Sequence, residues 1–163
     1  METYTVAFIG HRYIDDFHNT EQRLDEIVEK LIREKEYVCF YVGRNGDFDQ
    51  LASSSVLRVR KRVWDANSSL IWAVPYVTEE LNKHYDDYLA YYNEIDYFTE
   101  LDGCHPKAAI QKRNRLMIER ADLVIAYVTR ETGGAYQSLK YAERVGKGII
   151  NIAKIEDATI NCF

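Results

Sequence analysis

The stretch "YVCFYVGRNGDFDQLA", residues 37–52, indicates how this chain folds. Tyr37–Val42 is an uninterrupted apolar run, which is typical of a strand buried on both faces of a parallel sheet. The glycines of "GRNGD" then turn the chain, and Asp47 followed by Gln50 has the spacing of a helix N-cap with a capping box. A strand, a glycine-bearing turn and a helix in this order favour an α/β architecture.

The same order repeats on both sides of that stretch. Apolar runs predict strands, and helical spacing of apolar residues predicts helices, one of them with Asn19 as its N-cap. The expected strands are Tyr4–Ile9, Tyr37–Val42, Leu70–Val74, Leu123–Val128 and Gly148–Ile152. The expected helices are Asn19 to about Glu34, a helix capped by Asp47 whose apolar stripe extends from Phe48 to Val63, Pro106 to about Arg120, and Ala135–Val145. We therefore predict a Rossmann-like, doubly wound, mainly parallel five-stranded sheet of order 3-2-1-4-5, with helices on both faces.

Residues 76–105 interrupt this alternation with a tyrosine-rich segment of mixed polarity. An amphipathic helix that packs its rings on the flank of the sheet is the favoured interpretation, because aromatic stripes usually mark packing. A loop or a lid over a ligand site is the alternative. Apart from this insert, the 163 residues are expected to form a single domain.

The composition narrows the possible partners. The formal net charge of −5 disfavours nucleic acid as a partner, since general nucleic-acid binders usually carry a basic face. Cys39, Cys104 and Cys162 are odd in number and fit no metal-binding spacing, and His18, His84 and His105 are not grouped, so no metal site is expected. No cofactor is indicated.

The location is expected to be cytoplasmic. The start of the chain, "METYTVAFIG", has neither the basic segment nor the long apolar segment of a signal peptide. No apolar run approaches the roughly 20 residues that span a bilayer, so no membrane is expected as a partner. Free cysteines without a disulfide pattern favour a reducing compartment.

The candidate ligand site lies where the strands end, because open parallel sheets bind ligands beyond the carboxyl ends of their strands. The turn before the last helix should expose free N–H groups that favour an anion, and neighbouring arginines would pair with it. The dinucleotide pattern G-x-G-x-x-G and the Walker pattern are absent. The candidate ligand-binding residues are Gly10, His11, Arg12, Gly43, Arg44, Asn45, Gly46, Asp47, Asn114, Thr132, Gly133, Gly134 and Gln137.

Two of the candidate side chains have competing interpretations. Arg113 lies between Ile110 and Met117 on one helix face, and a guanidinium within an apolar stripe needs a partner when it is buried. That partner is either a ligand, with Asn114 sharing the task, or a structural ion pair, and a snorkelling side chain is a further possibility. His11, between a glycine and an arginine, is equally consistent with a ligand contact and with an incidental loop position.

Four motifs occur in the order of a known superfamily: "VAFIGHR", "FYVGRNGDFDQLA", "QKRNRLMIERADLVIAYV" and "TGGAYQSLKYAERVGKGIINI". They resemble the SLOG superfamily, which is named for the Smf/DprA DNA-processing proteins and the LOG phosphoribohydrolases. The chain is most similar to its small stand-alone bacterial members. The resemblance implies a Rossmann-like domain that binds nucleotides or nucleotide-derived ligands, and it implies a homo-oligomer that pairs through helices.

The resemblance also assigns catalytic positions. LOG enzymes carry a P-G-G-x-G-T-x-x-E motif after the fourth conserved strand. An arginine on the preceding helix acts with its glutamate to hydrolyse the N-glycosidic bond of a nucleoside monophosphate. The arginine corresponds to Arg113, and the first two glycines correspond to Gly133 and Gly134.

Beyond the two glycines the sequence departs from the LOG motif. Tyr136 and Gln137 stand in place of the third glycine and the threonine, and Lys140 stands in place of the glutamate. An ammonium group repels the oxocarbenium-like charge that a carboxylate stabilises. Glu143, three residues further along the helix, is the substitute acid that the sequence offers.

The leading hypothesis is therefore a nucleotide or nucleotide-derivative binding domain that senses or signals. The alternative is an N-glycosidase that uses Arg113 with Glu143, or with Asp47 or Asp49, as a non-standard acid. A DNA-processing role is the least favoured hypothesis, because the net charge of the chain is negative. Whether the protein is an enzyme stays open at this point.

Overall fold

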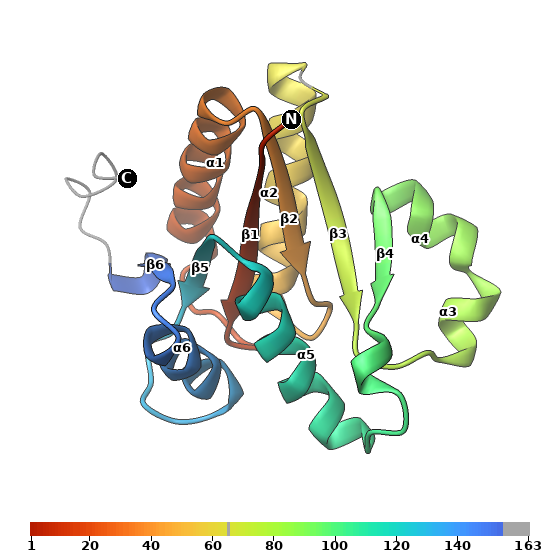
Figure 1. The fold of residues 1–163 in the computed structure, drawn as a ribbon. Coiled ribbons are helices and arrows are strands. Elements are labelled where there is room, and N and C mark those ends of the chain that lie inside the picture. The colour runs from red at the N-terminus through yellow and green to blue at the C-terminus, as the bar shows by residue number, and fades with distance from the viewer. Residues whose placement is uncertain (65, 155–163) are drawn as a thin grey trace.

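The computed structural model describes residues 1–64 and 66–154, so Cys162 lies outside the described part. Its centre is a parallel sheet with helices on both faces (Figure 1). The strands are β1 (Thr3–Gly10), β2 (Tyr37–Val42), β3 (Ser68–Val74), β4 (Glu94–Tyr97), β5 (Leu123–Tyr127) and β6 (Gly148–Asn151). The Rossmann-like α/β parallel architecture predicted from the sequence is confirmed.

The predicted strand number and order are wrong. The described sheet has six strands in the order β4-β3-β2-β1-β5-β6, not five in the order 3-2-1-4-5. The additional strand is β4, which lies inside the tyrosine-rich insert and pairs in parallel with β3 at the sheet edge. Its sequence, "EIDY", buries only Ile95 fully, so it lacks the apolar run by which the other strands were recognised.

Each face of the sheet is covered by one pair of long helices. The helices α1 (Phe17–Glu34) and α2 (Asp47–Val63) pack on one face, and α5 (Pro106–Arg120) and α6 (Gly134–Arg144) pack on the other (Figure 1). The insert adds two short helices, α3 (Glu79–Lys83) and α4 (Tyr85–Tyr91). Short 3-10 turns at Thr99–Leu101 and Ile152–Lys154 complete the described elements.

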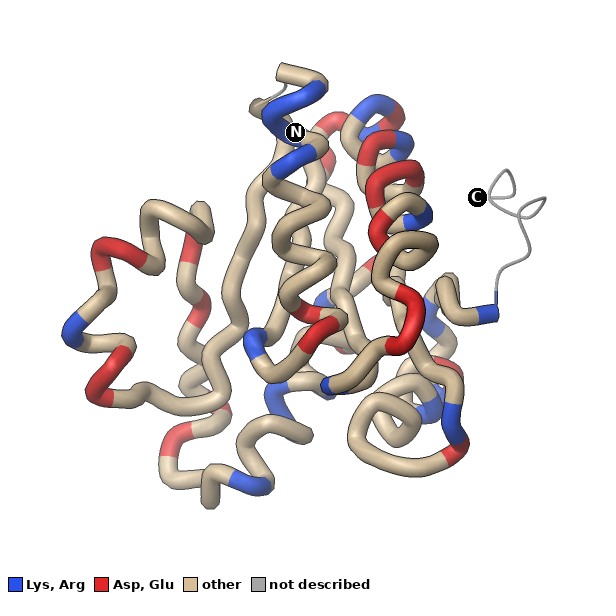
Figure 2. The backbone as a smooth tube through the Cα atoms, turned by 180° about the vertical axis from the view of Figure 1, so that it is seen from behind, with Lys and Arg blue, Asp and Glu red and all other residues tan. Residues whose placement is uncertain are grey.

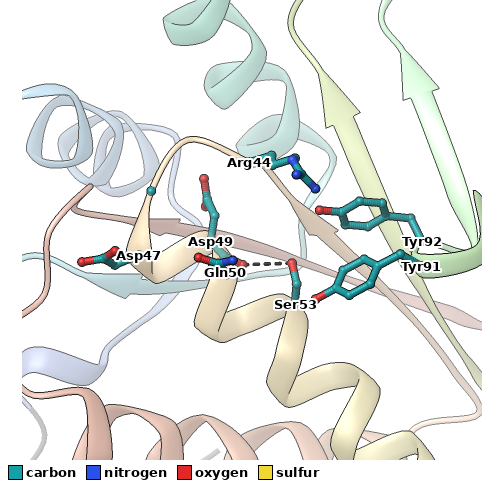
Figure 3. A pocket seen from close by; sticks show the side chains of 9 residues that line it. Arg44, Asp47, Asp49, Gln50, Ser53, Tyr91 and Tyr92 are labelled. Atoms are coloured by element: carbon teal, nitrogen blue, oxygen red, sulfur yellow. Dashed lines mark hydrogen bonds between the residues drawn. The ribbon is translucent and has the colours of Figure 1, made fainter. Parts of the chain in front are cut away.

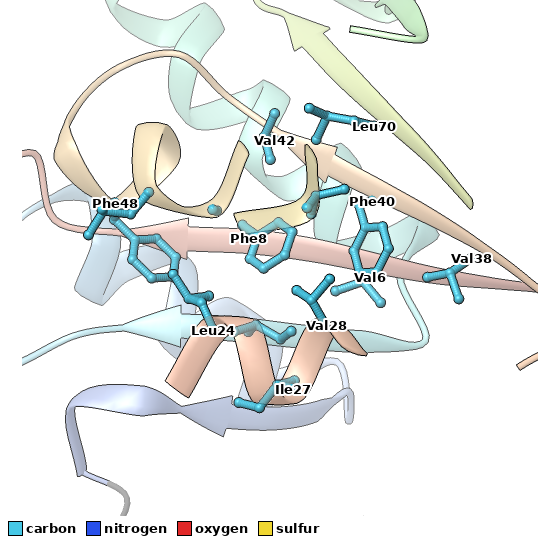
Figure 4. Close-up of a cluster of buried hydrophobic side chains, with 14 of the residues drawn as sticks. Val6, Phe8, Leu24, Ile27, Val28, Val38, Phe40, Val42, Phe48 and Leu70 are labelled. Atoms are coloured by element: carbon cyan, nitrogen blue, oxygen red, sulfur yellow. The ribbon is translucent and has the colours of Figure 1, made fainter. Parts of the chain in front are cut away.

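Side chains along β1 point alternately to the two faces of the sheet, which explains why the strands appear in the sequence as continuous apolar runs. Val6 and Phe8 face the α1–α2 side, where Phe8 stacks on Phe40 with ring centroids 5.9 Å apart (Figure 4). Ala7 and Ile9 face the α5–α6 side. Since both faces are covered, every position of the strand favours an apolar residue.

Two N-cap predictions are wrong in detail. The helix α1 begins at Phe17, and its cap is Asp16, whose Oδ1 accepts a hydrogen bond from the Asn19 N–H at 3.3 Å. Gly46 is the cap position of α2. The Asp47 carboxylate instead accepts from the Ile14 N–H at 3.1 Å and so ties the loop after β1 to the start of α2.

No helix within residues 1–64 and 66–154 is both long and apolar enough to cross a membrane.

Candidate functional site

The strand order reverses between β1 and β5, because the chain builds β2, β3 and β4 on one side of β1 and then returns to the other side. The loops after β1 and β5 therefore diverge, which in open α/β sheets leaves the crevice where ligands bind. A cavity of about 280 Å³ lies here, which we call the switch-point cavity. Eight predicted residues line it: Gly10, His11, Arg12, Asn45, Arg113, Asn114, Gly133 and Gly134.

The start of helix α6 forms one wall of the switch-point cavity. Gly133 adopts φ +90°, in the left-handed region that disfavours side chains, and the helix begins at the next residue. No side chain caps this end. The N–H groups of the first turn thus have no partner within the helix, and together with the helix dipole they favour an anion.

The Arg113 side chain lies at the inner end of the cavity and is only 2% exposed. Its guanidinium donates three hydrogen bonds, to the Ala73 carbonyl at 2.9 Å, to Asn45 Oδ1 at 2.7 Å and to Asn114 Oδ1 at 3.0 Å. Burial lowers its pKa, and the charge of Asp49 opposes that shift. Arg113 therefore joins the end of β3 to the loop after β2 through hydrogen bonds within the protein.

Asp49 is the carboxyl group nearest to this arrangement. Its Oδ2 accepts from the Asn45 N–H at 2.9 Å, and burial raises its pKa against the opposing effects of Arg113 and that N–H. A side chain at Gly43 would place its Cβ 2.9 Å from both Arg113 Nη2 and Asp49 Oδ2. Glycine at position 43 therefore leaves room for the side chains of Arg113 and Asp49.

His11 is fixed in one tautomer. The Thr129 N–H donates to His11 Nε2 at 2.9 Å, and an amide N–H can only donate. The neutral ring therefore carries its proton on Nδ1. Burial, and to a lesser degree the charge of Arg130, lowers the His11 pKa. The ring is a neutral member of the cavity wall and joins the loops after β1 and β5.

The loop Gly43–Asp47 is tied to the loop after β1. Arg12 Nε donates to the Asn45 carbonyl at 3.2 Å, and the Asp47 N–H donates to the Arg12 carbonyl at 2.8 Å. A Cβ on Gly46 would lie 2.4 Å from the Arg12 Cα, so this backbone approach requires glycine. The loop forms a fixed partition beside the switch-point cavity.

On the other side of this loop lies a second cavity of about 360 Å³, which we call the insert cavity. It is bounded by the loop after β2, by the first turns of α2 and by two tyrosines at the end of α4 (Figure 3). The predicted residues Gly43, Arg44, Gly46 and Asp47 line it, together with Asp49, Gln50, Ser53, Tyr91 and Tyr92.

Three predicted residues line neither cavity. Thr132 and Gln137 are exposed at the start of α6. Glu143 is exposed further along that helix and accepts from Lys140 Nζ at 3.1 Å. The pair points to the surface because positions three apart share one helix face, and the opposite face of α6 packs on the sheet.

Sequence reasoning missed several lining residues. Arg130 and Gln111 border the switch-point cavity, and Tyr91 and Tyr92 border the insert cavity. Arg130 follows β5 by three residues, so the strand-end rule that selected its neighbours was sufficient to find it. The tyrosines gave no such signal, because their position depends on the unrecognised strand β4.

No family model matches the sequence, and no curated protein matches it. DNA processing protein A (DprA) from Streptococcus pneumoniae superposes with a TM-score of 0.62 at 17% identity, covering 90% of this chain and 49% of that one. DprA from Helicobacter pylori, in a structure that describes its single-stranded DNA binding mode, gives 0.62 at 20% identity, covering 90% and 63%.

The fold is similar to that of DprA. This likeness supports the Rossmann-like fold that the sequence motifs implied. At these identities it concerns the fold alone, and the chain spans about half to under two thirds of the length of these DprA chains.

Proposed function

We propose that this protein binds a nucleotide or a nucleotide derivative, with an anionic group of the ligand in the switch-point cavity. The observation that carries the proposal is the meeting of three features in one cavity: the reversal of strand order, the uncapped start of α6 and the arginines of the two flanking loops. The reversal of strand order favours a ligand at this place, and the start of α6 and the arginines favour a phosphate or carboxylate group.

The two exposed arginines of this cavity have the binding role. Arg12 follows β1 and Arg130 follows β5, so they approach the start of α6 from different loops. Arg113 has a different role, since its guanidinium already donates to three protein oxygens. It positions Asn45 and Asn114 and adds a buried positive charge behind the anion.

Calorimetric titration with nucleoside monophosphates, cyclic nucleotides and ADP-ribose tests this proposal. Arg130→Ala should weaken binding of the active compound at least about tenfold, because a hydrogen bond to a charged group contributes about 1.5–3 kcal/mol. Arg144→Ala, an exposed arginine at the other end of α6, is the matched control and should leave binding unchanged. Absence of binding for every compound would refute the proposal.

One observation favours N-glycosidase activity as a second candidate. Burial raises the pKa of Asp49 against the opposing effects of Arg113 and the Asn45 N–H, and a raised pKa favours the protonated form that a general acid needs in order to protonate a leaving base. The acid in this version is Asp49, which lines both cavities, rather than Glu143, which lines neither. Incubation with nucleoside monophosphates should then release free base, and Asp49→Asn should abolish the release.

Nucleic acid returns as a candidate partner, although the sequence disfavoured it. The Helicobacter pylori protein is described as binding single-stranded DNA, and its chain is similar to this one in fold. Against this, the net charge is −5 and acidic residues are spread over α1 and the insert (Figure 2). A single-stranded oligonucleotide belongs in the same titration, and binding that weakens steeply with salt would favour this role.

We further propose that residues 1–163 act as one SLOG-like domain in the cytoplasm and self-associate through helices, as the resemblance implies. Light scattering coupled to size-exclusion chromatography tests the second part. A mass near 19.1 kDa at all concentrations would mean a monomer.

A further inference from the structure

The insert cavity has features that anion binding does not explain. Its aromatic wall consists of Tyr91 and Tyr92, whose rings meet edge to face with centroids 4.8 Å apart. Tyr92 is buried, whereas Tyr91 is 39% exposed and lines the cavity (Figure 3). The buried Tyr92 ring thus supports the Tyr91 ring, and part of the Tyr91 ring stays accessible to a ligand.

The support behind this wall is extensive. Tyr92 packs on Trp72 with centroids 5.4 Å apart, and burial raises the pKa of its hydroxyl against the opposing effects of Arg44 and Ser53. The Arg44 guanidinium also lies over the Tyr88 ring, 4.9 Å from its centroid. The Arg44 side chain is exposed, but aromatic faces lie against it, and these contacts reduce the entropy that it loses when it binds a ligand.

The polar groups of the cavity are mixed in character. Arg44 offers only donors, and the Gln50 amide offers both donors and an acceptor. Asp47 and Asp49 each accept a backbone N–H with Oδ2, from Ile14 and Asn45 respectively, so the acceptor that each has left is Oδ1. A phosphate would gain from Arg44 but would be repelled by the two carboxyl groups. A flat heterocycle with acceptors on one edge and donors on another fits this set better.

Guanine has that pattern. Its O6 and N7 atoms accept hydrogen bonds, and arginine is their commonest protein partner. Its N1–H and N2 amino group donate, and a carboxylate can accept both. Aromatic side chains bind bases by stacking, which contributes about 1–3 kcal/mol per base when measured by alanine substitution.

We propose that the insert cavity is a guanine-binding site. The base stacks on the Tyr91 ring, Arg44 donates to its acceptor edge, and the carboxyl groups at the start of α2 accept from its donor edge. The partition Gly43–Asp47 lies between this site and the switch-point cavity, so a nucleoside without a phosphate can bind here while the switch-point cavity stays empty.

Titration with guanosine, which has no phosphate, tests the site by itself. Saturable binding is expected, and adenosine, which lacks O6 and the N1–H and N2 donors, should bind at least about fivefold more weakly. Absence of guanosine binding, or equal affinity for the two nucleosides, would overturn the proposal.

Variants at the aromatic wall locate the bound base. Tyr91→Ala should weaken guanosine binding at least about fivefold, the lower end of the stacking range, and Tyr91→Phe should retain it. Tyr85→Ala removes a tyrosine from the start of the same helix with the same 39% exposure, so it is the matched control. Unchanged affinity in Tyr91→Ala would contradict the stacking.

Two more variants separate this site from the proposed anion site. Gln50→Ala, at an exposed position of α2, should weaken guanosine binding without altering the fold. Arg130→Ala should leave guanosine affinity unchanged while it weakens nucleotide binding in the switch-point cavity. If Arg130→Ala weakens guanosine as much as Tyr91→Ala does, the base is not held in the insert cavity and the proposal fails.

Discussion

The two cavities share Asp49 but differ in how the chain builds them. The switch-point cavity is formed by loops that directly follow apolar strands, and by a helix whose start is marked by two glycines. The insert cavity requires α4, which is held in place by a strand with a single fully buried residue. The comparison teaches that a cavity formed by loops at strand ends can be located from the sequence pattern, whereas a cavity that needs two tyrosines from a weakly patterned insert cannot.

The largest expected effect tests the structural role of Arg113. Arg113→Ala leaves the Ala73 carbonyl and two amide oxygens without their donor, so the free energy of unfolding should fall by about 3 kcal/mol or more. Urea denaturation followed by circular dichroism measures this. Arg115→Ala, an exposed neighbour on the same helix, is the control and should change it by less than about 0.5 kcal/mol. Equal behaviour of the two variants would mean that Arg113 is not part of the framework.

The next effect tests whether the insert is an integral part of the sheet. Ile95 is 8% exposed on β4, and Ile95→Ala should lower the free energy of unfolding by about 2 to 4 kcal/mol. It should also weaken guanosine binding, because β4 begins only two residues after Tyr92. If the change is below about 0.5 kcal/mol, the insert is a detached lid, as the alternative interpretation of the sequence held.

A smaller effect separates two kinds of glycine. Gly46→Ala places a Cβ 2.4 Å from the Arg12 backbone, and the required shift should cost about 1 to 3 kcal/mol. Gly133→Ala meets no atom within 4 Å, so its cost is that of the positive φ alone, about 1 kcal/mol. Thermal unfolding of both variants compares them. The opposite ranking would mean that the loop after β1 adapts easily.

The smallest effect concerns His11 and pH. Burial lowers its pKa in the folded protein, so below about pH 6.5 the unfolded chain takes up a proton that the folded chain does not. Stability should therefore fall as the pH drops from about 6.5 toward the lowered folded value. His11→Gln keeps an acceptor for the Thr129 N–H without a titrating ring, and it should show a flatter dependence between pH 7.5 and 5.5. An unchanged slope in the variant would assign the effect to other groups.

The strongly patterned parts of the fold were predictable. Tyr37–Val42 and the glycine turn after it were predicted with the bounds of the observed strand, since an apolar run buried on both faces gives an unambiguous signal. Helix α5 was predicted with its observed ends because Pro106 occupies the first helical position. Strand β4 was missed because Ile95 is its one buried residue, so its sequence contains no apolar run.

The candidate site was predictable in its location but not in the roles of its residues. The strand-end rule selected the loops that do meet at the switch point. It did not reveal that Arg113 donates to three protein groups, because hydrogen-bond partners 40 and 68 positions away in the chain leave no local pattern. Glu143 was selected by its offset from Lys140, and the rotation of α6 places both on the surface.

The position of Asp49 has a consequence for both sites at once. Its carboxyl group borders each cavity, and its charge depends on what is near it, since burial and Arg113 already shift its pKa in opposite directions. A ligand in one cavity that ionises or neutralises this group changes the electrostatic field in the other. Thermodynamic reciprocity then requires that the second ligand alters the affinity for the first by the same factor. If both proposed ligands bind, we therefore expect the protonation of Asp49 to link their affinities.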